Sequence, residues 1–136
     1  MKQIFVRDIM SGVENIPMIS PFAPVRDLLV LMSGNDRRFV IVERTNEHDA
    51  FGIVTYTNVL EAIFSEDGDM DLLNVYDIAT KPIMQIVSDL DIRYAAQLMV
   101  RYGVKHLIVT WEGELTGLVS MHDIASVLME EAKKSM

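Results

Sequence analysis

The sequence has no cysteine among its 136 residues, so a disulfide-stapled fold and a cysteine-ligated metal site are both excluded. Apolar runs are short, and none approaches the roughly eighteen residues that a membrane-spanning helix needs. The first ten residues, MKQIFVRDIM, lack the apolar core of a secretory signal. These absences fit a reducing compartment, and we expect a cytoplasmic location with no membrane span.

Positive charge is also scarce, because 12 Lys and Arg stand against 20 Asp and Glu, which gives a net charge of −8. Binding to nucleic acid depends on clustered Lys and Arg, so a nucleic-acid partner is not expected. A local basic pocket in such an acidic chain would still be compatible with a bound nucleotide.

Catalytic motifs are missing as well, since the sequence has no G-x-S-x-G, no Walker loop and no G-x-G-x-x-G. Ser120, His122 and Asp123 have the side chains of a hydrolase triad, but they occupy one turn and cannot converge from separate segments. The sequence therefore gives no indication of an enzyme.

The sequence also lacks a complete metal-binding motif. The acidic connector over residues 66–74 carries Asp67, Asp69 and Asp71, but Leu72 and Ile78 stand where an EF-hand loop needs Gly and Glu. The three histidines have no zinc-ligand spacing. A solvated linker is the better interpretation of the connector.

What the chain does contain is an internal repeat of five elements in the same order. Four of the matching segments are 6–9 with 75–78, 25–32 with 92–99, 39–42 with 106–109, and 52–55 with 117–120. The spacing between matching segments changes only from one element to the next, as length changes in loops would produce. We interpret this as a tandem duplication, with a first repeat over residues 1–68 and a second over residues 69–136.

Each repeat is predicted to contain a helical turn, a strand, an amphipathic helix, a two-stranded hairpin and a final helix. In the first repeat these elements are expected at 6–10, 16–20, 25–32, 39–42 with 51–55, and 57–65, with Pro24 at a first helical position. A half of this size buries little apolar surface alone. The fold class is therefore α+β, with two β-α-β-β-α repeats packed sheet against sheet around a pseudo-two-fold axis.

This ordered set resembles the cystathionine β-synthase (CBS) domain pair, also called a Bateman module. The resemblance covers nearly the whole chain. The segments that carry it are the lead-ins VRDIM (6–10) and VYDIAT (75–80), the hairpin strand GVKHLIV (103–109) and the segment GLVSMHD (117–123). No single motif is decisive, but the set in this order is specific.

The resemblance implies a regulatory, ligand-sensing module rather than an enzyme. CBS pairs usually bind AMP, ADP or ATP between their repeats, and sometimes S-adenosylmethionine or a dinucleotide such as NAD. They commonly form homodimers and signal occupancy to a separate effector protein by a shift of conformational population. The alternative is a ligand-independent dimerisation or protein-interaction module.

Ser120 and Asp123 are the first candidates for ligand contact. A carboxylate at a helix start can accept hydrogen bonds from both ribose hydroxyls, while the serine hydroxyl and free N–H groups meet a phosphate. The same S-x-x-D spacing is also that of a capping box, which would only finish the helix. The resemblance favours the ribose contact, and both roles can coexist. The matching Thr55 and Asn58 lack the charge and predict a weaker second site.

A second group lies where the resemblance places the border of the purine. Ile83 and Met84 would flank the adenine ring, and Thr80, followed by Pro82, would hydrogen-bond its edge or the ribose. Val104 would form the opposite wall. The alternative for Ile83 and Met84 is that they are ordinary strand core.

Basic residues gather at the start of the first hairpin strand in both repeats. They are Arg37 and Arg38 in the first repeat and Lys105 and His106 in the second. One interpretation is a phosphate clamp, and the other is a set of charges that protect exposed strand edges. His122 would make phosphate binding depend on pH, because histidine changes charge between pH 5 and 8.

Gly52 and Gly117 stand inside predicted strands, where glycine weakens side-chain packing. An isolated strand glycine indicates a bulge or the close approach of another backbone. The approaching group is either a ligand or the other repeat, and the sequence leaves both open.

Overall fold

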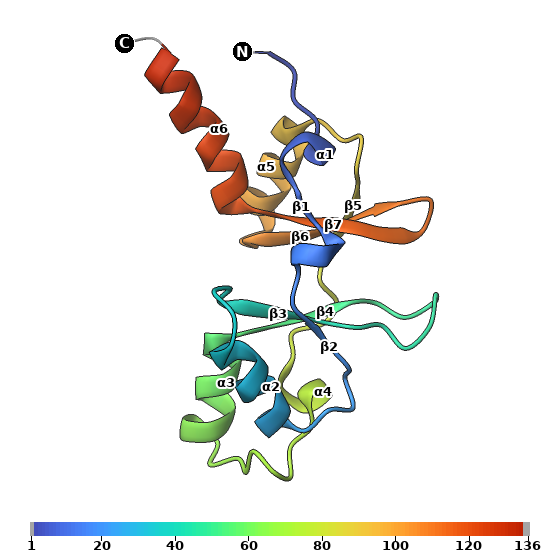
Figure 1. The fold of residues 1–136 in the computed structure, drawn as a ribbon, viewed down its shortest axis with the longest axis vertical. Helices are drawn as coiled ribbons and strands as arrows, with labels where there is room; N and C mark the ends of the chain where they lie inside the picture. The colour runs from blue at the N-terminus through green and yellow to red at the C-terminus, as the bar shows by residue number, and fades with distance from the viewer. Residues whose placement is uncertain (1, 135–136) are drawn as a thin grey trace. The chain divides into compact units, whose positions relative to one another are not determined.

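A computed structural model describes residues 2–134, which form two compact units (Figure 1). The central unit is the contiguous segment Ile16–Ile83, and the terminal unit combines residues 2–15 with residues 84–134. Each unit has its own sheet, its own helices and its own apolar core.

The central unit contains a three-stranded sheet in the order β2-β3-β4, in which β2 is parallel and β4 antiparallel to β3. Its elements are β2 (Met18–Ile19), α2 (Val25–Ser33), β3 (Phe39–Val42), β4 (Gly52–Thr55), α3 (Tyr56–Leu60), the π-helical turn η2 (Glu61–Ser65) and α4 (Val75–Ile78). All four residues of β3 are buried, which explains why its sequence is a continuous apolar run.

The terminal unit contains a four-stranded sheet in the order β1-β7-β6-β5. Its elements are α1 (Val6–Ile9), β1 (Ser11–Gly12), η1 (Val13–Asn15), β5 (Gln85–Val87), α5 (Ile92–Tyr102), β6 (His106–Trp111), β7 (Glu114–Ser120) and α6 (Met121–Lys134). The β6–β7 hairpin is antiparallel, as the sequence predicts, and Gly113 takes positive φ in its turn. Helix α5 starts at the N-cap Asp91 and ends at Gly103 in the left-handed conformation.

The two repeats exchange their lead-in segments. Val6 of the first repeat is completely buried in the core of the terminal unit, and Val75 of the second repeat is completely buried in that of the central unit. Equivalent hydrogen bonds hold them, because Val6 N–H donates to Leu90 O at 2.8 Å and Val75 N–H donates to Ala23 O at 2.8 Å. Along the chain, the boundaries of the compact units therefore fall at residues 15/16 and 83/84, whereas the predicted boundary between the sequence repeats is at 68/69.

Some local predictions differ from the structure. The strand expected at 16–20 is only Met18–Ile19, because prolines at positions 17 and 21 remove ladder donors. Pro24 is the N-cap of α2 rather than its first helical residue. Ser11–Gly12 forms a strand that the sequence analysis did not predict, since two residues are too few to show an alternating pattern.

Candidate functional site

The junction of β7 and α6 is built by a reciprocal capping box. Ser120 N–H donates to Asp123 Oδ2 at 2.8 Å, and Asp123 N–H donates to Ser120 Oγ at 3.0 Å. These bonds fix both side chains at the helix start. Within residues 2–134, Asp123 Oδ1 has no hydrogen-bond partner, so the half-buried carboxylate keeps one oxygen available.

The start of β6 lies directly beside this junction. His106 is the register partner of Ser120, and Met121 N–H donates to Lys105 O at 2.8 Å. Val104, in the turn before Lys105, packs against the core of the terminal unit. The structure therefore brings Lys105, His106 and Val104 to the Ser120 corner.

His122 and Asp123 both line an open hollow of about 450 Å³ on the surface of the terminal unit. The other lining groups are Ile4 and Ile9 from the lead-in and Ser126, Val127, Glu130, Glu131 and Lys134 from α6. The acidic side of this hollow disfavours phosphate. A phosphate at this corner is better served by the exposed cation Lys105 at the start of β6.

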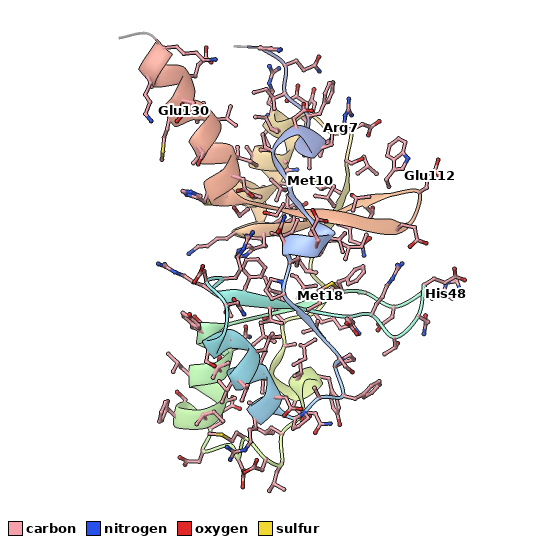
Figure 2. All side chains as sticks on the ribbon, viewed as in Figure 1. Arg7, Met10, Met18, His48, Glu112 and Glu130 are labelled. Atoms are coloured by element: carbon pink, nitrogen blue, oxygen red, sulfur yellow. The ribbon has the colours of Figure 1, made fainter. Side chains whose placement is uncertain are left out.

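The lead-in of the first repeat, which carries Met10 (Figure 2), continues into β1, and β1 pairs antiparallel with β7. Its Ser11 was not among the predicted site residues. Ser11 pairs with Leu118, two residues before Ser120. A Cβ atom on Gly117 would lie 2.4 Å from Ser11 O and 2.8 Å from Met10 Sδ. Position 117 therefore accommodates only glycine, because the lead-in backbone of the same unit occupies the space that a side chain would need. The repeat already contained the signal, because Ser11 occupies the place in the first repeat that Thr80 occupies in the second.

The equivalent corner in the central unit is closed by its own side chains. Asn58 Oδ1 accepts from Thr55 N–H at 2.8 Å and from Thr55 Oγ1 at 3.1 Å. Asn58 Nδ2 donates to Thr80 Oγ1 at 3.1 Å. The amide therefore joins the helix start to the lead-in, and both of its polar atoms are used.

The structure places Thr80 with Asn58, in the unit that does not contain Asp123. Thr80 and Ile53 exchange two backbone hydrogen bonds of 2.9 Å, and a Cβ atom on Gly52 would lie 3.1 Å from Thr80 O. The sequence alone did not indicate that Thr80 and Asp123 lie in different units. The reason is that each lead-in pairs with the sheet of the other repeat, Ser11 with Leu118 and Thr80 with Ile53.

Other purine-border candidates are divided between the units. Ile83 is 7% exposed in the central unit and donates its N–H to Phe51 O, as a core residue would. Pro82 is exposed and follows a cis peptide bond. Met84 packs against the core of the terminal unit and accepts from Ile108 N–H at 2.9 Å.

Arg37 and Arg38 lie at the start of β3 in the central unit. Arg37 stacks over the ring of Phe39, with 5.9 Å between its guanidinium carbon and the ring centroid. The backbone N–H of Arg37 donates to Asn35 Oδ1. Arg38 is exposed. A phosphate-clamp role for these arginines remains a prediction.

An ion pair also holds Lys81, the residue that follows Thr80 in the lead-in of the central unit. Lys81 Nζ lies 2.6 Å from Asp49 Oδ1, and this contact, with a further hydrogen bond from Thr45 N–H, holds the pKa of Asp49 well below its usual range. A carboxyl with a lowered pKa in the folded state stabilises the fold above its ordinary pKa. That contribution is lost as the pH falls towards the folded-state pKa.

We therefore expect Lys81→Met to move the pKa of Asp49 back towards its ordinary value, since the largest contribution to the shift is removed. Titration of the Asp49 carboxyl carbon by NMR measures this change directly. An unchanged titration curve in the variant would show that Lys81 does not pair with Asp49 in solution.

Comparison with known proteins agrees with this architecture. The CBS domain family model matches the chain twice, over residues 6–65 and 75–130. The chain belongs to the CBS-domain family. The tandem CBS-domain pair expected from the sequence, with its α+β fold, is thereby confirmed.

Solved CBS structures resemble the whole chain. The CBS domain of the bacterial CNNM/CorC family Mg²⁺ transporter in complex with ATP is 26% identical, with a TM-score of 0.79 over 92% of this chain and 87% of that one. A hexameric CBS-CP12 protein from bloom-forming cyanobacteria is 30% identical, with a TM-score of 0.78 over 90% of this chain and 69% of that one.

Curated relatives are longer than this chain. A 33.4 kDa protein in the ribosomal RNA operon of Thermofilum pendens is 27% identical over 96% of this chain and 49% of its own length. The chain spans about half the length of the curated relatives that it matches. Across residues 2–134, no helix is long and apolar enough to cross a membrane, and no cluster of acidic or histidine side chains could hold a metal ion.

Proposed function

We propose that this CBS-domain pair is a regulatory module that binds an adenine nucleotide at the Ser120–Asp123 corner of the terminal unit. The observation that carries the proposal is the difference between the two helix starts. Asp123 keeps Oδ1 without a partner among the described residues, whereas the polar atoms of the Asn58 side chain are occupied by Thr55 and Thr80.

The chemistry of the corner suits a ribose next to a phosphate. A carboxylate accepts hydrogen bonds only, and two vicinal hydroxyls are matched donors for its oxygens. Lys105 lies at the same corner and supplies a positive charge for the phosphate. Met10 and Ser11 lie against Gly117 of β7, the strand that leads to this corner, and add an apolar and a polar group to its surroundings.

The solved relatives support the ligand class. The transporter CBS domain with a TM-score of 0.79 to this chain was solved in complex with ATP. AMP, ADP and ATP share the adenosine that the corner would hold, and S-adenosylmethionine and NAD contain it as well. Binding would shift the population of conformations and signal occupancy to an effector protein in the cytoplasm.

A panel of ligands tests the proposal through the melting temperature. We expect AMP, ADP or ATP to raise it, by the linkage term RT ln(1 + [L]/Kd), and GTP or inorganic phosphate to raise it much less. Isothermal titration should give one site for each chain, since only one corner has an available carboxylate. If no adenine-containing ligand changes the melting temperature, the proposed function is wrong.

A second candidate function, homodimerisation without a ligand, is favoured by apolar side chains exposed on the helices. Phe64 in η2 is 76% exposed, Val100 in α5 is 78% exposed, and Leu128 in α6 is 57% exposed. The cyanobacterial CBS-CP12 relative is a hexamer. Sedimentation velocity with and without ATP separates the two candidates, because a purely structural module would associate equally in both conditions.

A further inference from the structure

The two units are built alike where α2 and α5 begin, and this makes their differences informative. Val25 N–H donates to Leu73 O at 2.9 Å in the central unit, and Ile92 N–H donates to Ile4 O at 3.0 Å in the terminal unit. The same register makes Lys2 the equivalent of Asp71 and Arg93 the equivalent of Arg26.

In the central unit the charges of Arg26 and Asp71 neutralise each other in an ion pair. The guanidinium of Arg26 binds both carboxylate oxygens of Asp71, with 2.8 Å between Nη2 and Oδ2. In the terminal unit both equivalents, Lys2 and Arg93, are cations. Neither forms an ion pair with any other residue in the range 2–134.

The apolar side chains at this place differ between the units, and the terminal unit has a hollow here. Leu29 packs against the central core, but its equivalent is Ala96, whose side chain is three carbons shorter. Val25 is completely buried, whereas its equivalent Ile92 is only half-buried. In the central unit the connector also lies against the start of α2, since the backbone N–H of Arg26 donates to Met70 O at 3.0 Å.

The hollow in the terminal unit has a volume of about 220 Å³. Its floor is apolar and consists of Ile4, Ile92, Ala96, Ile124, Val127 and Leu128. Lys2, Arg93 and Asp91 also line it. The Asp91 carboxylate is the N-cap of α5 and accepts a hydrogen bond from the backbone N–H of Arg93 at 2.8 Å. The lining therefore carries an excess of positive charge in a chain whose net charge is −8.

We propose that this hollow binds a small anion with an apolar body, of the class of short- to medium-chain carboxylates. The carboxylate would pair with Arg93 and Lys2, as Asp71 pairs with Arg26, and the hydrocarbon would replace the side-chain volume lost at Ala96. The volume lies below the roughly 300 Å³ at which pockets for drug-sized ligands begin, which favours a small ligand. The hollow shares Ile4 and Val127 with the hollow beside Asp123, but Lys2, Arg93 and Ala96 line only this one, and the proposal does not depend on the proposed nucleotide.

Methyl NMR with isoleucine labelling tests the site with octanoate as the probe and no nucleotide present. We expect octanoate to shift the methyl signals of Ile4, Ile92 and Ile124, because these three lie in the floor. Acetate should shift none of them, and neutral octanol should bind much more weakly. Equal binding of octanol, shifts confined to other isoleucines, or no shifts at all would each overturn the proposal.

Two variants copy the central unit into the terminal unit. Lys2→Asp recreates the partner of Arg93, and Ala96→Leu fills the floor, so each should weaken octanoate binding by roughly tenfold or more. Leu29→Ala, the matched change in the central unit, should leave the affinity unchanged. Isoleucine signals outside the hollow report whether each variant is folded. If both folded variants bind octanoate like the unmodified chain, the site is not there.

Discussion

Asp123→Ala is expected to abolish the rise in melting temperature that AMP, ADP or ATP gives this CBS-domain pair, whereas Asn58→Ala should retain most of it. The reason is that Asp123 offers an oxygen without a partner among the described residues, while the amide of Asn58 is already bonded to Thr55 and Thr80. Losing a charged acceptor for two ribose hydroxyls removes the strongest kind of hydrogen bond at the corner. Thermal melts with and without nucleotide measure the difference.

Asp123 also caps α6, so its removal lowers the melting temperature before any ligand is added. The relevant quantity is therefore the ligand-induced rise in each variant. Asp123→Asn is the matched control, because it keeps the cap geometry and converts the corner to the Asn58 type. A full rise in Asp123→Asn would show that the charge is not needed, and a lost rise in Asn58→Ala would move the site to the central unit.

Gly117→Ala should destabilise the fold by about 1–3 kcal/mol, the usual cost of forcing extra volume into a packed site. The added Cβ would lie 2.4 Å from a backbone oxygen, Ser11 O, which cannot rotate away as a side chain would. The strand pairing of Ser11–Gly12 with β7 would have to open. Urea unfolding followed by circular dichroism measures the loss.

Gly52→Ala is the matched substitution in the other unit. Its Cβ would lie 3.1 Å from Thr80 O, so a shift of a few tenths of an ångström relieves the contact and a smaller loss is expected. Equal losses in the two variants would mean that the lead-in approaches both glycines to the same extent, contrary to the distances in the structure.

The tandem fold could be predicted from the sequence because its signals are local and occur twice. Apolar positions in α2 and α5 follow the same helical spacing, and the β6–β7 hairpin carries its turn residues between two apolar runs. The S-x-x-D capping box was also visible, since it depends only on residues three apart.

The exchange of lead-in segments could not be predicted, because it is a choice between two equivalent partners. Val6 and Val75 are the same residue type and both are followed by Asp and Ile at the same spacing, so the sequence does not show which core each one completes. For the same reason the sequence does not indicate that Thr80 lies in the unit of Asn58 and Ser11 in the unit of Asp123. The strand glycines marked a close approach of backbone, and the structure identifies that backbone as Ser11 for Gly117 and Thr80 for Gly52.

The exchange also sets the order in which the units can be completed on the ribosome. All residues of the central unit have been synthesised once Ile83 has been added. Strand β1 pairs with β7, which follows far later in the sequence, so the terminal unit closes only after β7 has been synthesised. Contacts between segments so distant in sequence form slowly, since a long loop must be closed first. The lead-in of the first repeat is therefore synthesised long before the strand that it pairs with.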